Sequence, residues 1–152
     1  MMTNHPVAAS IDRLRFLCDT IPDLLFALSE EAFSASPAPG KWSKKEIIGH
    51  LIDSATNNHH RFVRGQFEIG PLITYDPDAW NSSGHYSDMD SYGVILFWTA
   101  YNQHLVELLK RIPKQAFIRE VATGGMKPYS LTFLVNDYVG HLEHHLRQVV
   151  DY

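Results

Sequence analysis

Three histidines in two distant segments are the residues of this chain best suited to chemistry. His50 lies in the segment GHLIDSATNNHHR, and His141 and His145 lie in the segment HLEHHLRQ. A spacing of four residues advances a helix by about one turn, so His141 and His145 can reach one ion from the same helix face. His50 adds a third imidazole from a different helix. Three ligands leave one tetrahedral position open, as in catalytic rather than structural zinc sites.

A second interpretation of these histidines stays open, because a histidine on an apolar helix face is more often a hydrogen-bonded core residue than a metal ligand. Several imidazoles buried together favour a shared metal, since each unsatisfied buried polar group costs about 1–3 kcal/mol. His104 is the best substitute should His50 face the wrong way. The other histidines are expected to face solvent or to lie outside the helices: His5, His59, His60, His85 and His144.

Imidazole ligands suit Zn, Ni, Cu or Fe rather than Mg or Ca, and Zn²⁺ or Ni²⁺ is the expected ion. Such an ion lowers the pKa of a bound water to about 7 or ionises a thiol. Asp53 and Glu143 are the carboxylates nearest to the ligands in sequence. Each is expected to face solvent or to support a ligand from behind, so the catalytic residues are left unassigned.

The composition indicates a single globular domain over residues 1–152, with 45% hydrophobic and 20% charged residues. There are 13 basic and 17 acidic residues and no basic run, so a nucleic-acid-binding protein is not expected. No apolar stretch approaches the ~20 residues of a membrane span, and the first residues do not resemble a secretion signal. We expect a cytoplasmic protein, with Cys18 in the core because it lies on an apolar helical stripe.

Apolar residues recur at helical spacing in four stretches, which predicts an all-α four-helix bundle. The first spans residues 7–33, with a kink or division at Pro22. The second follows a capping box formed by Ser43 and Glu46 and runs to about residue 66. The third covers residues 92–112, and the fourth starts near Ser130.

The segment between Gly65 and Tyr92 breaks the helical pattern and is rich in Gly, Pro, Asp, Asn and Ser. A connection this long can carry the chain back across a bundle, so that the second and third helices run parallel. Its aromatic residues could cover the open end of the bundle, although aromatic residues in a loop more often pin it to the core. These residues are Tyr75, Trp80, Tyr86 and, at its end, Tyr92.

The runs KWSKKEIIGHLIDSATNNHHRFVRGQ and HLEHHLRQ together resemble the DinB superfamily, including its YfiT-like members, and the resemblance extends from Ile11 to Val149. It implies a four-helix bundle with up-down-down-up topology, commonly a homodimer, that holds a divalent metal through three histidines. Carried over residue by residue, these are His50, His141 and His145. Leu146 and Arg147 depart from the small residue usual after the last ligand, which leaves the ligands intact.

The resemblance also implies two activities, because some branches of the superfamily are similar to thiol-dependent S-transferases or isomerases and others are called metal-dependent hydrolases. We therefore expect a metal-dependent enzyme that acts on a small molecule, either an S-transferase-like enzyme using a low-molecular-weight thiol or a hydrolase. The alternative is a metal-binding stress-response module without catalysis. That alternative predicts a fourth protein ligand that closes the coordination.

Overall fold

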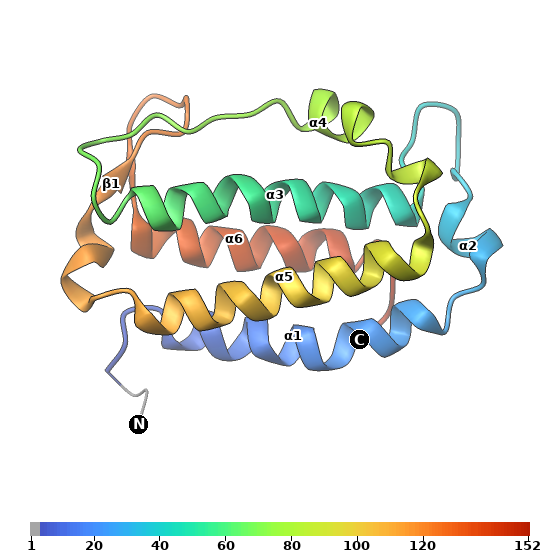
Figure 1. Cartoon of the computed structure of the whole chain (residues 1–152), viewed down its shortest axis with the longest axis horizontal. Helices are drawn as coiled ribbons and strands as arrows, with labels where there is room; N and C mark the ends of the chain where they lie inside the picture. Colours follow the sequence, from blue (N-terminus) through green and yellow to red (C-terminus); the bar gives the residue numbers. More distant parts are fainter. Residues whose placement is uncertain (1–3) are drawn as a thin grey trace.

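A computed structural model describes residues 4–152 as a bundle of four long helices (Figure 1). These are α1 (Ala8–Phe26), α3 (Lys44–Arg64), α5 (Ser91–Arg111) and α6 (Leu131–Leu146). Going round the bundle, α1 packs against α5, α5 against α3, α3 against α6, and α6 against α1. The predicted all-α four-helix bundle is confirmed.

The helix directions follow the expected up-down-down-up order. Figure 1 shows α3 and α5 running the same way, and α1 and α6 running the opposite way. Two consecutive parallel helices need a connection that spans the length of the bundle, and the chain between them passes along the outside of α3.

The first helix is shorter than predicted. Pro22 lies inside α1 and does not divide it, and the helix ends at Phe26. A separate short helix, α2 (Glu30–Ser34), begins after Ser29, whose side chain accepts a hydrogen bond from the Ala32 amide. The prediction of one helix over residues 7–33 was therefore wrong in its extent, because the serine cap starts a new helix there.

Side-chain caps determine where α3 and α6, the two helices that carry the three histidines, begin. The Ser43 hydroxyl accepts from the Glu46 amide at 3.1 Å, and the Glu46 carboxylate accepts from the Ser43 amide at 2.7 Å. The predicted capping box is thus confirmed. Ser130 caps α6 through the Phe133 amide at 3.2 Å, directly after a small antiparallel hairpin of β1 (Glu120–Val121) and β2 (Tyr129–Ser130). The 3₁₀ helix η2 (Lys114–Ile118) precedes that hairpin.

The long connection contains two short helices, α4 (Pro77–Gly84) and the 3₁₀ helix η1 (Tyr86–Asp88). Tyr86 fastens it to α3, because its hydroxyl donates to the Asp53 carboxylate and its ring lies against Gly49. A Cβ atom at Gly49 would stand 2.2 Å from the Tyr86 ring, so only glycine leaves room for this contact. Tyr86 thus pins the connection to the core.

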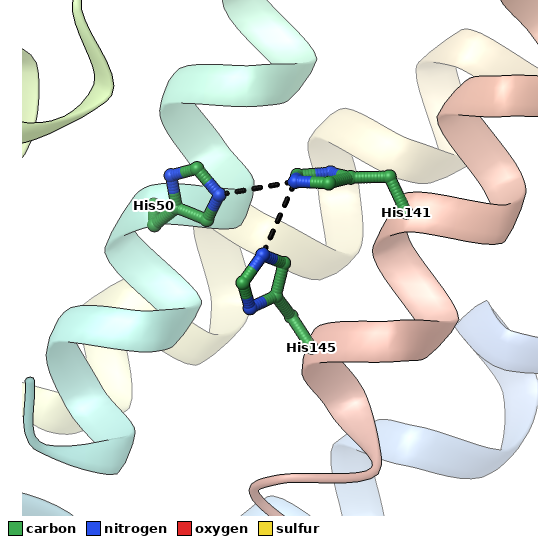
Figure 2. Close-up of side chains that lie close together, drawn as sticks. All are labelled: His50, His141 and His145. Carbon is green, nitrogen blue, oxygen red and sulfur yellow. Dashed lines mark hydrogen bonds between the residues drawn. The ribbon is translucent and has the colours of Figure 1, made fainter.

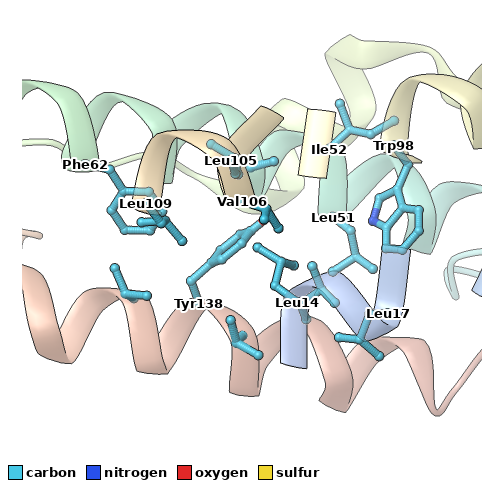
Figure 3. Packing of buried hydrophobic residues seen from close by; sticks show 14 of the residues in the cluster. Leu14, Leu17, Leu51, Ile52, Phe62, Trp98, Leu105, Val106, Leu109 and Tyr138 are labelled. Carbon is cyan, nitrogen blue, oxygen red and sulfur yellow. The ribbon is translucent and has the colours of Figure 1, made fainter. Parts of the chain in front are cut away.

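The core between the four helices is mainly apolar (Figure 3), and a polar link inside it joins α6 to α5. The hydroxyl of Tyr138 donates to Asn102 Oδ1 at 2.6 Å, and the Asn102 amide donates to the Trp98 carbonyl at 2.9 Å. Cys18 is buried, as expected, and burial raises the pKa of its thiol to about 12. Among the described residues, no helix combines the length and apolar character that a membrane crossing requires.

We expect Gly49→Ala to destabilise the protein by about 1–3 kcal/mol, because the added methyl group collides with the Tyr86 ring. The matched control is Gly140→Ala in α6, where a Cβ meets nothing within 4 Å. That change should stabilise the helix by up to about 1 kcal/mol. Urea denaturation of both variants tests the contact, and equal stabilities would contradict it.

Candidate metal centre

The structure brings together the three histidines predicted from the sequence (Figure 2). His50 points from α3 toward α6, and His141 and His145 point from successive turns of α6 toward α3. The Nε2 atom of His141 lies 3.3 Å from Nε2 of His50 and 3.1 Å from Nε2 of His145. The ligand atoms of the three side chains all lie within 4.8 Å of one another.

Hydrogen bonding alone satisfies this arrangement only in part. A neutral imidazole nitrogen offers either one N–H or one lone pair, so Nε2 of His141 can serve only one of its two neighbours well. Three lone pairs directed at one cation would satisfy all three rings. Metal–nitrogen bonds of about 2.0–2.1 Å at tetrahedral angles place two nitrogen ligands about 3.3 Å apart. The observed separations of 3.1 and 3.3 Å fit that geometry.

The electrostatics of the group also suit a cation. His50 is 3% exposed. Burial, and then the neighbouring histidines, lower the pKa of both His50 and His141 to about 4. The pKa of His145 is lowered as well, mainly by burial. His50 and His141 are therefore neutral at pH 7, which is the form that binds metals.

Two residues of the sequence motifs, Gln148 and Trp42, support the histidines. Gln148 Oε1 lies 3.2 Å from Nδ1 of His145, and by accepting from that nitrogen it leaves Nε2 with its lone pair free. The Trp42 ring lies 5.0 Å from the His50 ring and covers one side of it. In the sequence, the three-residue spacing from His145 to Gln148 could have indicated the contact between these two residues. No sequence pattern indicated the contact between Trp42 and His50.

The remaining histidines lie elsewhere. His104, the substitute for His50, is exposed on α5, with its ring 5.4 Å from that of His59. His59 was expected to face solvent, but it is half-buried and its Nδ1 atom lies 2.9 Å from the Tyr101 hydroxyl. His60 and His144 are exposed, as expected. Among residues 4–152, no further histidine, cysteine or carboxylate joins the group of three.

Both candidate carboxylates are engaged away from the histidine group. Glu143 accepts from the Arg13 guanidinium at 2.6 Å, which ties α6 to α1 and lowers the pKa of Glu143. Asp53 was expected to face solvent or to support a ligand, but it is 3% exposed and bonds Tyr86. Its Oδ2 atom has no partner among the described residues, and burial raises its pKa.

The aromatic residues of the connection do not form one wall over the bundle end. Tyr86 is buried against α3, while Tyr75 and Trp80 pair with each other at 5.9 Å between ring centres. Tyr92 is exposed at the start of α5 and packs against Phe26 at 5.1 Å. Of the two interpretations left open for these rings, the one in which they pin the connection to the core describes Tyr86, which is buried and bonded to Asp53.

Known proteins share this fold. The chain is 26% identical, over 114 residues, to the Bacillus subtilis protein named "Putative metal-dependent hydrolase YfiT"; the match covers 74% of this chain and 64% of that relative, less than two thirds of its length. The solved structure of YfiT superposes with a TM-score of 0.83 at 22% identity, covering 93% of this chain and 82% of that one. It is described as a probable metal-dependent hydrolase with an unusual four-helix bundle topology.

A mycothiol-dependent maleylpyruvate isomerase also superposes, with a TM-score of 0.77 at 14% identity, covering 98% of this chain and 62% of that one. At such identities the structural matches show the fold alone. The family model of the DinB superfamily matches residues 13–149, which include all three histidines. The chain therefore belongs to the DinB superfamily.

Proposed function

We propose that this protein is a metal-dependent enzyme acting on a small molecule, and that His50, His141 and His145 hold one divalent transition metal, Zn²⁺ or Ni²⁺. The observation that carries the proposal is the convergence of three imidazole nitrogens from two helices, with separations of 3.1 and 3.3 Å that suit metal ligands. The chain's membership of the DinB superfamily, with its YfiT relative, supports the same proposal.

A metal held by three histidines supplies an open position at which a thiol or a water is ionised at neutral pH. The residues of this chain prepare that position. Burial keeps His50 and His141 neutral, Gln148 orients the His145 ring, and the Trp42 ring lies beside that of His50. No protein nucleophile is needed, and Cys18 is unsuited to that role because it is buried with a raised pKa.

The thiol-dependent reaction is the first form of the proposal, with a low-molecular-weight thiol attacking an electrophile, and hydrolysis by water is the second. The isomerase neighbour is described as mycothiol-dependent and YfiT as a metal-dependent hydrolase, so each form has a relative of the same fold. The non-catalytic alternative required a fourth protein ligand, and none joins the group among the described residues. A homodimer and a cytoplasmic location stay predictions.

We expect the purified protein to bind about one equivalent of Zn²⁺ or Ni²⁺ per chain and the His50/His141/His145→Ala variant to bind none. His144→Ala is the matched control, because His144 is exposed on the same helix and lies outside the group. Elemental analysis by mass spectrometry after dialysis measures both. A triple variant that keeps its metal, or a folded wild type that takes up none, would refute the site.

The affinity for Zn²⁺ should depend little on pH between 7 and 5.5. If the three histidines had ordinary pKa values near 6.5, protonation at pH 5.5 would lower the Zn²⁺ affinity by roughly tenfold for each histidine. The three together would lower it by about a thousandfold. His50 and His141, with pKa values of about 4, are still neutral at that pH, so we expect a loss of at most roughly tenfold. Competition with a chelator of known pH dependence measures the ratio. A loss near a thousandfold would mean that the imidazoles are not held neutral.

Turnover separates the two forms of the reaction. In the thiol form, the metal-loaded protein should couple a small thiol to a chromogenic aryl halide, forming the sulfur–carbon bond with release of halide and a proton. The rate should fall to background in His141→Ala and persist in His144→Ala. Ester or amide hydrolysis without any thiol, abolished by the same variant, would favour the hydrolase instead.

A further inference from the structure

A cavity of about 610 Å³ adjoins the histidine group. Its walls come from the segment between α2 and α3, the first turn of α3, α4, and the chain after α6. Its volume is within the range of small-molecule sites. Three parts of the chain that are distant in sequence, namely residues 37–47, α4 and the chain after α6, thus line one open space.

Two lining residues connect this cavity to the histidines. Trp42 lines the cavity and lies 5.0 Å, between ring centres, from His50. Gln148 lines it too, and its Oε1 atom lies 3.2 Å from Nδ1 of His145. A ligand in the cavity would therefore lie next to the side chains that hold the histidine rings in place.

The lining carries one cation and one anion, on different elements. Lys41 precedes α3, and Asp78 belongs to α4. Within the described part of the chain, neither forms an ion pair. The rest of the lining includes the apolar side chains of Trp42 and Ile47 and the polar side chain of Gln148. Lys41 and Asp78 are exposed, and two unpaired charges of opposite sign in one lining match a small ligand that carries both charges.

We propose that Lys41 and Asp78 make this cavity selective for small molecules bearing both a carboxylate and an ammonium group, as an amino acid does. Lys41 pairs with the carboxylate and Asp78 with the ammonium, and the ligand's remaining side group faces the histidines. The inference rests on the proposed function for the role of that side group, which is a thiol in the thiol-dependent form. Lys41 and Asp78 are specificity residues and take no part in bond making.

The test uses four small thiols and the cobalt-loaded protein. L-Cysteine carries both charges, N-acetyl-L-cysteine only the carboxylate, cysteamine only the ammonium, and 2-mercaptoethanol neither. The sulfur-to-cobalt charge-transfer band reports binding without any need for turnover. We expect L-cysteine to bind most tightly, with roughly fivefold lost for each missing charged group, as for partly solvated ion pairs.

The four thiols differ in acidity as well as in charge, so variants of Lys41 and Asp78 are needed to measure the contribution of each residue. Lys41→Met should weaken the binding of L-cysteine and of N-acetyl-L-cysteine by roughly fivefold and leave the binding of cysteamine unchanged. Asp78→Asn should weaken the binding of L-cysteine and of cysteamine and leave the binding of N-acetyl-L-cysteine unchanged. Because each thiol is compared with itself across two proteins, its acidity cancels. Lys44→Met and Asp88→Asn remove the same charges outside the cavity lining and should change none of the four.

The outcomes separate this inference from the proposed function. If all four thiols give the cobalt band with no dependence on Lys41 or Asp78, the inference is overturned and the metal site stands. If cobalt binds without any thiol band, or does not bind, L-serine, ethanolamine and lactate are compared on the same variants by ligand-observed NMR. Preference for L-serine that is lost in both variants supports the inference without the thiol, and equal binding of the three overturns it.

Discussion

The close approach of three imidazoles inside the bundle is the constraint on which the rest of the site depends. Their nitrogens are too near for one hydrogen-bond pattern to satisfy all of them, and burial lowers the pKa of His50 and His141 to about 4. Neutral lone pairs directed at one point are what a divalent transition metal requires. The packing of α3 against α6 sustains that arrangement, since the histidines come from both helices.

The long connection between α3 and α5 does more than carry the chain back along the bundle. It allows α3 and α5 to run parallel, and it is fastened to α3 by Tyr86, which fits only because Gly49 has no side chain. The same contact buries Asp53 one turn beyond His50, away from solvent. Once fastened, the connection places α4 beside the cavity, so one element serves both the fold and the proposed selectivity.

Function here follows from the site rather than from the fold, because one fold hosts several chemistries. The relatives of similar architecture are described as a metal-dependent hydrolase and a mycothiol-dependent isomerase. Around the histidines of this chain, Trp42 lies 5.0 Å from the His50 ring and Gln148 lies 3.2 Å from His145. Lys41 and Asp78 line the adjoining cavity. Those residues would decide which small molecule reaches the proposed metal.

The sequence by itself determined the four helices, the capping box at Ser43 and the pairing of His141 with His145, because periodicity and caps are local properties. The sequence also favoured His50 as the third histidine, but it left His104 open as a substitute until the tertiary structure placed His50 in the group. The tertiary structure alone decided that Asp53 is buried beneath Tyr86. A helical pattern shows which residues share a face, but the rotation of one helix against another depends on packing across the whole core. Only that packing brings residues 91 positions apart within 3.3 Å.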